Sequence, residues 1–355
     1  MYIIIAIIAF GLLIAVHELG HFTSAKLLGV RVNEFAIGMG PKLLKKQGKE
    51  TLYTLRALPF GGFCAMGEDD EPEDERSFPV QKHWKRVVIL ASGAIANLIA
   101  AFIIVVIVVF VTIGVSDYLA GTMITGFFDG FPLEGANGLM AGDTVVAING
   151  EKLYYVDDFA LFMGLYGDAP VDMKVRRNGE LITINDLPLE KREYITESGS
   201  TWKYGLYFNS IKNTFGEKLK YSCYLTANYV RIVRISLIQL FSGKVSVREM
   251  SGPVGIVDVM NDIGRSSASI GIAIVNIAST TALIGANLAV MNLLPIPALD
   301  GGRILFLLIN WVIEKVTRRR VNPKYEGYIH TTAMVLLLGF MVFILINDVV
   351  KIVSG

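Results

Sequence analysis

Two histidines and a glutamate have the clearest chemical spacing in this sequence. His17, Glu18 and His21 belong to the stretch HELGH, which is an H-E-x-x-H motif. On an α-helix, residues four apart share one face, so both imidazoles can reach one metal ion. The Glu18 carboxylate stands beside them and can accept a proton from a water molecule. The motif therefore predicts a zinc-dependent hydrolytic site.

The motif lies at the end of an apolar segment, YIIIAIIAFGLLIAV at residues 2–16. Ionisable side chains inside a membrane span are costly, and they need partners or a water-filled cavity. Histidines that only pack between helices are therefore a poor explanation of the motif. The segment has no basic region and no A-x-A cleavage site, which favours a retained helix over a signal peptide.

A catalytic zinc site needs a third protein ligand and one open position. The stretch NLLPIPALDGGR offers a carboxylate at Asp300. Pro295 and Pro297 cannot continue a regular helix, so the chain must form a loop before Asp300. Irregular backbone at membrane depth has to be buried or to line a cavity, where a carboxylate is a natural metal ligand. The other two histidines, His83 and His330, lie at the edges of apolar spans without a partner motif.

Four apolar stretches are long enough to cross a bilayer, which takes about 20 residues. They cover residues 2–28, 87–116, 270–294 and 329–347 of the 355-residue chain. The chain is 53% hydrophobic, and its net charge of +1 gives no reason to expect a nucleic acid partner. Its two cysteines lie in no CxxC spacing, which argues against a disulfide framework and a zinc finger. We expect a multi-pass protein embedded in a lipid bilayer.

Basic residues predict the orientation of the spans. Lysines and arginines gather between the first and second spans and again after the third. The positive-inside rule places both of these segments in the cytoplasm and both termini outside. The long segment 117–265 is then extracytoplasmic. With this topology the first and third spans run in the same direction, so His17 and Asp300 arrive at a similar depth, toward the cytoplasmic side.

Two stretches outside the spans have β patterns. Residues 30–66 alternate like strands and are punctuated by glycines. The acidic run at 68–75 predicts a solvated turn. Residues 120–190 predict a compact β-rich domain, because Asn-Gly pairs at 149–150 and 178–179 are hairpin signals.

Part of this β-rich domain resembles a PDZ domain. The stretch GLMAGDTVVAING at 138–150 is similar to the PDZ core, and WKYGLYF at 202–208 resembles its carboxylate-binding loop. A circularly permuted PDZ domain would place that strand last, as it is here. The domain could bind peptide C-termini, or it could be a size filter that excludes intact ectodomains. The amphipathic stretch 216–241 predicts a helix at the outer membrane surface, as a gate or as a docking helix.

These features together resemble the site-2 protease family. HELGH lies in a first span, a PDZ-like domain follows the second, and N-x-x-P-x-P-x-x-D-G comes later. Within the family the chain is similar to the bacterial regulator of sigma-E proteases. The resemblance covers nearly the whole chain, including FAIGMGPKL, GGFCAMGE and GPVGI. Enterobacterial members carry two PDZ domains, whereas this chain has room for one, which leaves the substrate open.

The resemblance implies an intramembrane zinc metalloendopeptidase. It implies a zinc ion (Zn2+) held by His17, His21 and Asp300, with Glu18 as the catalytic base. It implies that Asn292 contacts the substrate backbone, although a helix-terminating role before the prolines stays open. The implied substrates are transmembrane proteins or peptides trimmed beforehand by an upstream site-1-type protease, such as anti-sigma factors, or remnant signal peptides. The implied location is the bacterial inner (cytoplasmic) membrane.

Further substrate contacts are expected at Asn97, Gly61 and Gly62. Asn97 matches the family pattern G-x-x-x-N in the second span, where helix packing is the alternative role. Gly61 and Gly62 open the stretch GGFCAMG, whose strand edge could bind an extended substrate through main-chain hydrogen bonds. The protein itself could equally fill those bonds.

The expected fold is a polytopic α-helical membrane protein with four transmembrane helices, a small membrane-associated β-element and one extracytoplasmic PDZ-like β-rich domain. Its parts in chain order are transmembrane helix 1 with HELGH (1–28), the cytoplasmic-side β-element and acidic loop (29–82), transmembrane helix 2 (83–116), the PDZ-like domain (118–210), an amphipathic helix and linker (211–265), transmembrane helix 3 with the LDG loop (270–302), a cytoplasmic-side connection (303–328) and transmembrane helix 4 (329–350).

Two other functions fit part of the pattern. A non-catalytic membrane adaptor would use its PDZ domain and hold a structural zinc, but such a site needs no base, so Glu18 argues against it. A metal transporter would need a series of ligands along a span, and the sequence shows none.

Overall fold

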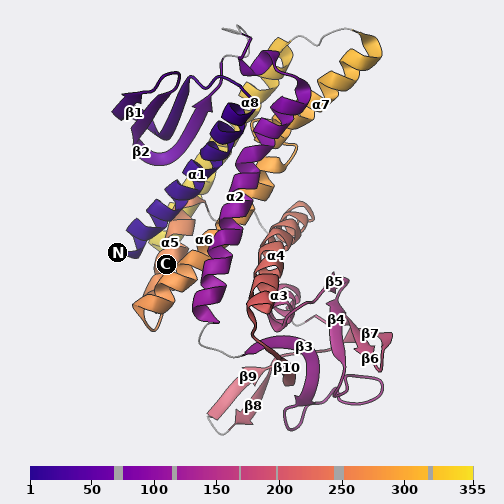
Figure 1. Ribbon diagram of the computed structural model, residues 1–355. Helices are drawn as coiled ribbons and strands as arrows, with labels where there is room; N and C mark the ends of the chain where they lie inside the picture. Colours follow the sequence, from indigo (N-terminus) through magenta and orange to yellow (C-terminus); the bar gives the residue numbers. More distant parts are fainter. Residues whose placement is uncertain are drawn as a thin grey trace. The chain divides into compact units, whose positions relative to one another are not determined.

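The computed structural model describes residues 1–67, 75–113, 118–167, 169–196, 199–243, 252–318 and 323–354. All but the last residue of the acidic run predicted as a turn lies outside the described residues. The chain divides into two compact units, one formed by Met1–Val108 with Tyr229–Gly355 and one formed by Val109–Asn228. The first unit is mainly helical, and the second holds most of the strands (Figure 1).

Long helices dominate the first unit. They are α1 (Tyr2–Leu27), α2 (His83–Thr112), α5 (Pro253–Ser266), α6 (Ile270–Leu293), α7 (Asp300–Thr317) and α8 (Pro323–Ser354). The helix α4 (Phe215–Phe241) begins in the second unit and ends in the first. Among the described residues, four segments are long and apolar enough to cross a membrane: Tyr2–Leu27, His83–Thr112, Ile270–Leu293 and Gly327–Asp348. These agree with the four spans predicted from the sequence.

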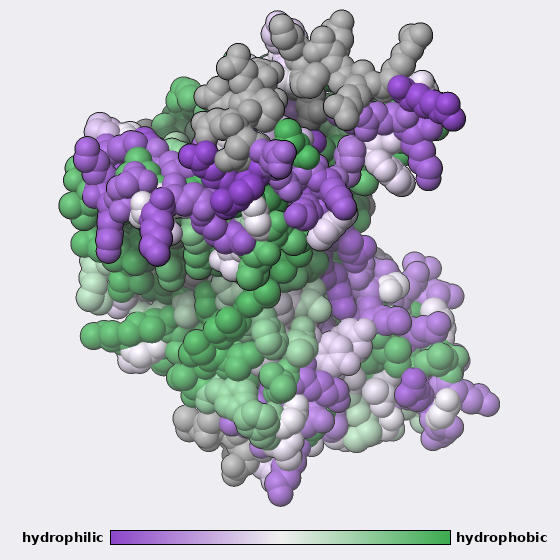
Figure 2. Space-filling view, turned by 45° about the horizontal axis from the view of Figure 1, so that its top comes forward, coloured by the Kyte–Doolittle hydropathy of each residue, from purple (hydrophilic) through white to green (hydrophobic). Residues whose placement is uncertain are grey.

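The outer faces of these helices are apolar, as lipid contact requires. Exposed apolar side chains recur along two of them, at Ile4, Ile8 and Leu12 of α1 and at Ile99, Ile103 and Ile107 of α2. Figure 2 shows a broad hydrophobic surface bordered by hydrophilic residues. A water-soluble protein rarely exposes so large a continuous apolar area. The chain is therefore a multi-pass membrane protein.

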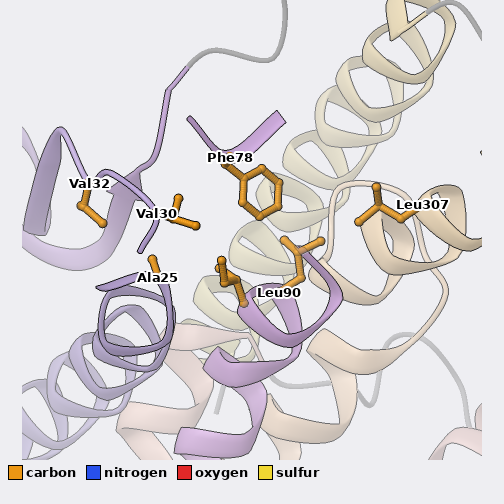
Figure 3. Packing of buried hydrophobic residues seen from close by; sticks show 7 residues of the cluster. Ala25, Val30, Val32, Phe78, Leu90 and Leu307 are labelled. Carbon is orange, nitrogen blue, oxygen red and sulfur yellow. The ribbon is translucent and has the colours of Figure 1, made fainter. Parts of the chain in front are cut away.

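A buried cluster fixes the end of α1 against its neighbours. Its members come from α1, the segment after it, the short 3₁₀ helix η1 (Phe78–Val80), α2 and α7: Ala25, Val30, Val32, Phe78, Ile89, Leu90 and Leu307. Figure 3 shows Phe78 lying between the side chains of α1 and those of α2 and α7. Burying such side chains contributes about 1.5–3 kcal/mol for each large one. The cluster thereby holds together the three helices that carry the candidate site.

Helix α5 occupies a stretch that the sequence pattern treated as a linker. Pro253 lies in its first turn, where the missing N–H costs nothing. A buried carboxylate of α8 satisfies its free amides, because Asp348 accepts hydrogen bonds from the Gly252 and Gly255 N–H groups at 3.1 and 2.9 Å. Met260 then packs against Ala6 of α1 and Ile277 of α6. Similarly, α7 occupies much of the connection expected at 303–328.

The β-element consists of β1 (Glu34–Gln47) and β2 (Leu52–Ala65), which pair in one small sheet. Residues 34–37 of β1 pair with 52–55 of β2 in parallel register and with 62–65 in antiparallel register. Among the described residues, segment 62–65 has no strand partner except β1, so it forms one edge of the sheet. Phe22 of α1 packs on this element through the Phe35 ring, with centroids 5.1 Å apart.

A partly exposed ion network joins the two strands of the β-element, and it should respond to pH. Glu34 accepts hydrogen bonds from Arg56 and Thr54 of β2 at 2.8 Å each and from Lys42 at 3.0 Å. Burial alone would raise the pKa of Glu34, but these donors outweigh burial and lower it to about 2. The carboxylate therefore stabilises the fold above its unfolded-state pKa of about 4.3, by at most about 3 kcal/mol, and this stabilisation is lost as the pH falls toward 2.

We expect a shift from pH 6 to pH 3 to lower the unfolding temperature of the wild type more than that of Glu34→Gln. The variant has no carboxylate to protonate at this position, so its unfolding temperature starts lower and changes less. Thermal unfolding of the detergent-solubilised chain at both pH values measures the difference. An equal drop in the two proteins would show that Glu34 does not carry this pH dependence.

The second unit contains a six-stranded sheet. Its strands run in the spatial order β10 (Leu206–Lys212), β3 (Tyr118–Phe127), β4 (Thr144–Ile148), β6 (Val171–Arg177) and β7 (Glu180–Leu187), and β5 (Glu151–Lys152) pairs with β4. Strands β8 (Arg192–Thr196) and β9 (Gly199–Lys203) form a separate hairpin, and α3 (Val156–Tyr166) follows β5. The two predicted Asn-Gly hairpin turns are present, since Asn149 and Asn178 both adopt positive φ between paired strands.

Candidate metal centre

Three potential metal donors meet where α1 and the start of α7 come together. His17 and His21 lie one turn apart on α1, and Asp300 is the first residue of α7. The Nε2 atoms of the two histidines are 3.2 Å apart, and they lie 3.2 and 3.3 Å from Asp300 Oδ2. Within the described part of the chain, these three form the one group of His, Cys, Asp or Glu side chains close enough to share a metal ion.

The spacing of these donor atoms fits a zinc ion. Nitrogen and oxygen ligands lie about 2.0–2.1 Å from zinc, so two of them in a tetrahedral arrangement are about 3.3–3.4 Å apart. Among the described residues, Asp300 Oδ2 is buried and receives no hydrogen bond. A carboxylate oxygen at 3.2 and 3.3 Å from two imidazole nitrogens needs a cation between them, either a proton on one ring or a metal ion. The donor set therefore fits a metal site with three protein ligands.

Helix α2 fixes the orientation of His21. His21 Nδ1 lies 2.8 Å from the Ile89 carbonyl oxygen, which can only accept a hydrogen bond, so Nδ1 carries the proton. The lone pair of the neutral ring is then on Nε2, the atom that faces His17 and Asp300. This backbone contact is the kind of supporting interaction that orients a metal-binding histidine. His21 itself is only 6% exposed.

Two asparagine amides flank His17. The Nδ2 atoms assigned to Asn97 of α2 and Asn292 of α6 both lie 3.5 Å from His17 Nδ1. Asn97 is fully buried, and among the described residues its Oδ1 has no hydrogen-bond partner. Rotating the Asn97 amide by half a turn would place Oδ1 where it can accept a hydrogen bond from the His17 Nδ1–H group. The position of Asn97 therefore suits orienting His17, whereas Asn292 is partly exposed.

The loop between α6 and α7 brings Asp300 to the histidines. Leu294 takes an extended conformation before Pro295 and ends α6. Ala298 then adopts φ = +77°, which is rare for a residue other than glycine. A Cβ on Gly301 would lie 2.3 Å from the Leu294 carbonyl oxygen, so only glycine allows this close approach. The loop therefore has one tightly defined path into α7.

Glu18 faces the β-element. A Cβ on Gly62 would lie 3.0 Å from Glu18 Cγ, so the edge segment of β2 passes directly beside this carboxylate. Gly61, one residue earlier, has φ = +82° and lies over Met39 of β1. Burial, and to a smaller extent the Glu18 carboxylate, raises the pKa of the Cys64 thiol to about 12. Within the described residues, the Cys64 thiol is not among the side chains close enough to share a metal ion with His17 and His21.

Gly93 of α2 packs directly against both histidines. A Cβ at this position would lie 2.4 Å from His21 Nε2 and 2.7 Å from His17 Cε1. We expect Gly93→Ala to displace both imidazoles and to lower zinc affinity and peptide hydrolysis, the latter by about 100-fold, as a misplacement of about 1 Å can do.

Zinc content and hydrolysis of the purified variant measure this effect. Gly339→Ala is the matched control, because among the described residues nothing lies within 4 Å of a Cβ on this glycine of α8. Wild-type zinc content and activity in Gly93→Ala would show that the two helices can separate without harm to the site.

Sequence reasoning singled out His17, His21 and Asp300, which the structure brings together, and it missed two residues near them. Sequence reasoning assigned no separate role to Gly93, although it is the glycine of the G-x-x-x-N pattern that ends at Asn97. His330 was set aside for lack of a partner motif, yet its Nδ1 accepts a hydrogen bond from the Ala298 N–H at 2.9 Å. The chain has only four histidines, and this scarcity was the one signal in the sequence that His330 could have a role.

Comparisons with known proteins show the family of this chain. The family model described as "Peptidase family M50" matches residues 5–340. A Clostridium acetobutylicum protein named as a proposed zinc metalloprotease is 36% identical over 98% of this chain and 97% of its own length. Proteins with the same kind of name from Clostridium perfringens and Fusobacterium nucleatum are each 35% identical over 99% of both chains. The chain therefore belongs to peptidase family M50, the site-2 proteases, which are zinc metalloproteases of membranes.

Proposed function

We propose that this protease hydrolyses peptide bonds inside transmembrane segments, with zinc held by His17, His21 and Asp300. The observation that carries the proposal is the meeting of these three donor atoms within 3.3 Å of one another, on helices that include candidate membrane spans. Zinc bound there would supply a Lewis acid that polarises the scissile carbonyl and lowers the pKa of a water molecule.

Glu18 is the proposed general base. Its carboxylate accepts a proton from the attacking water while the water oxygen bonds to the carbonyl carbon of the substrate. The carbon–nitrogen bond then breaks, and Glu18 returns the proton to the leaving amine nitrogen. Its place on α1 directly after His17 supports this role, and so does its closeness to the strand edge at Gly62.

The supporting residues have separate proposed roles. Ile89 and Asn97 of α2 orient the two histidines so that both Nε2 lone pairs face Asp300. Asn292 lies beside His17 and is partly exposed, so its amide can bind the substrate backbone. For Asn97 we favour the orienting role over the substrate contact expected from the family pattern, because the residue is fully buried.

A substrate segment has to be extended before its carbonyl groups can react, because a helix satisfies them internally. We propose that the substrate adds to the edge segment 62–65 of β2 by main-chain hydrogen bonds. The support is that this edge is unpaired among the described strands and that Gly62 lies against Glu18. An added strand would therefore pass next to the base.

The second unit is proposed to be the PDZ-like domain and to act on trimmed substrates. Strand β10, which follows Gly205 of the WKYGLYF stretch, lies at the edge of the sheet, and its Phe208 packs on Phe159 of α3. We propose that this edge strand receives peptide C-termini, such as those left by an upstream site-1-type protease. The alternative is a size filter. Binding of carboxyl-terminated peptides to the full chain, with amidated peptides as controls, separates the two roles.

The proposed location is the bacterial cytoplasmic membrane, with both termini and the PDZ-like domain outside the cytoplasm. The support is the concentration of basic residues between the first two spans and after the third. Labelling of the exposed Cys223 by a membrane-impermeant reagent in intact bacterial cells is the test. Labelling that requires permeabilised cells would reverse the orientation.

The test of the proposed function is hydrolysis of a model transmembrane segment by the purified full-length chain. We expect cleavage inside the apolar segment, its loss after treatment with a zinc chelator and its return when zinc is restored. A substrate with a trimmed ectodomain, of the kind an anti-sigma factor or remnant signal peptide would present, should be cleaved faster than the intact one. Zinc binding without hydrolysis of any such substrate would favour the non-catalytic adaptor.

A further inference from the structure

His330 links α8 to the loop that carries Asp300. It lies near the start of the fourth candidate span, Gly327–Asp348, and its Nδ1 accepts a hydrogen bond from the Ala298 N–H at 2.9 Å. Ala298 precedes Asp300 by two residues. The contact therefore joins a helix that supplies no metal donor to the segment that sets the position of one.

The bonded residue is also the least favourable point of the loop backbone. Ala298 adopts φ = +77°, and a left-handed conformation costs a residue with a Cβ about 1–2 kcal/mol. Such a conformation persists only where the surroundings hold it. The next residue, Leu299, is tied back to the Ile296 carbonyl oxygen at 3.1 Å, so the N–H of Ala298 faces away from that turn and toward α8.

The His330 ring is held in the orientation that this bond needs. Phe306 of α7 packs against it with ring centroids 5.2 Å apart and an interplanar angle of 66°. Because Nδ1 accepts a hydrogen bond from a backbone N–H, it carries no proton of its own. His330 therefore acts at this atom as a fixed, neutral acceptor.

We propose that His330 is a positioning residue, which holds the α6–α7 loop in the conformation that presents Asp300 to His17 and His21. The inference rests on the proposed function, since it concerns the same metal site. Supporting hydrogen bonds of this kind commonly change metal affinity or activity by about 10- to 100-fold. Here the support acts on the backbone that leads to the ligand.

Two polar substitutions of His330 test the role of Nδ1. Asn places an acceptor oxygen at the position of Nδ1, whereas the longer Gln places it near the position of Nε2. We expect His330→Gln to lower zinc affinity by about 10-fold or more and to alter the visible spectrum of the cobalt-substituted full-length protein. His330→Asn should keep affinity and spectrum close to the wild type. Competition with a chelator gives the affinity, and thermal unfolding shows that both variants fold.

His83→Gln is the matched control, because His83 is another histidine at the edge of a span and lies 3.7 Å from Glu314, outside the site. It should leave zinc affinity and spectrum unchanged. Wild-type affinity and spectrum in His330→Gln would overturn the inference, and so would an equal loss in the Asn and Gln variants, which would assign the effect to ring packing. If Asp300→Ala also keeps its zinc, the proposed site fails as a whole. If Asp300→Ala loses zinc and His330→Gln does not, the inference about His330 fails and the proposed metal site stands.

Discussion

Glu18→Gln is expected to reduce peptide hydrolysis by about three orders of magnitude, within the range of about 10²–10⁴-fold that a general base contributes. The amide of glutamine has nearly the same shape as the carboxylate, but it cannot accept the water proton. Zinc content should stay at the wild-type level, because Glu18 is not one of the three converging donors. The measurements are the cleavage rate of a model transmembrane substrate and the metal content of the same sample.

The combination of lost turnover and retained zinc is what identifies a base. If the variant lost zinc as well, the effect would be assigned to collapse of the site and not to proton transfer. Cleavage at the wild-type rate would remove Glu18 from the proposed chemistry. In that case a carboxylate at membrane depth beside Gly62 would need another explanation.

Asp300→Ala is expected to remove zinc from the protein and to abolish hydrolysis with it. The two histidines of α1 would remain, but two ligands bind zinc far more weakly than three. Removing a supporting hydrogen bond lowers metal affinity by about 10- to 100-fold. The loss of zinc affinity in Asp300→Ala should be larger than that. Chelator competition on the purified chain measures this affinity, and excess zinc should restore only part of the activity.

Glu314→Ala is the control for this substitution. It removes a carboxylate from the same helix, but Glu314 lies near the other end of α7 and contacts His83 instead of His17 or His21. It should retain both zinc and activity. Wild-type zinc affinity in Asp300→Ala would show that the third donor comes from elsewhere. The search would then turn to the partly exposed amide of Asn292 and to residues outside the described ranges.

The donor residues could be anticipated because their geometry is local. The H-E-x-x-H spacing fixes two imidazoles on one helix face, whatever the rest of the fold. Pro295 and Pro297 require a break after α6, so a loop before Asp300 followed from backbone chemistry alone. A shared depth of His17 and Asp300 was predicted by counting residues along two spans expected to run in the same direction, and it stays a prediction.

The surroundings of the donors could not be anticipated, because they depend on how distant helices approach one another. That Gly93 touches both imidazoles is a property of α2 lying against α1, and no spacing within α2 indicates it. The contact between His330 and Ala298 depends on the placement of α8 and on one unusual φ angle. From the sequence alone, His330 has no partner motif, so no role could be predicted for it.

Some elements outside the site could also be predicted from the sequence, and others could not. Local sequence patterns predict the Asn-Gly turns and the apolar spans, and the structure contains both. Helix α5 was missed although Pro253 is a recognised start signal, because its apolar face becomes meaningful only when α1 and α6 cover it. The start of α7 at Asp300 was likewise not predicted, because it depends on the close packing that Gly301 and Gly302 allow against the loop backbone.

The donors of the proposed site come from opposite ends of the chain, and this affects when the enzyme can become active during synthesis. The base and both histidines enter the membrane with the first helix, while Asp300 emerges only after most of the protein has been made. A nascent chain therefore lacks a complete metal site for most of its translation. With the proposed ligand set, hydrolysis of neighbouring proteins could begin only after the segment that carries Asp300 has been made.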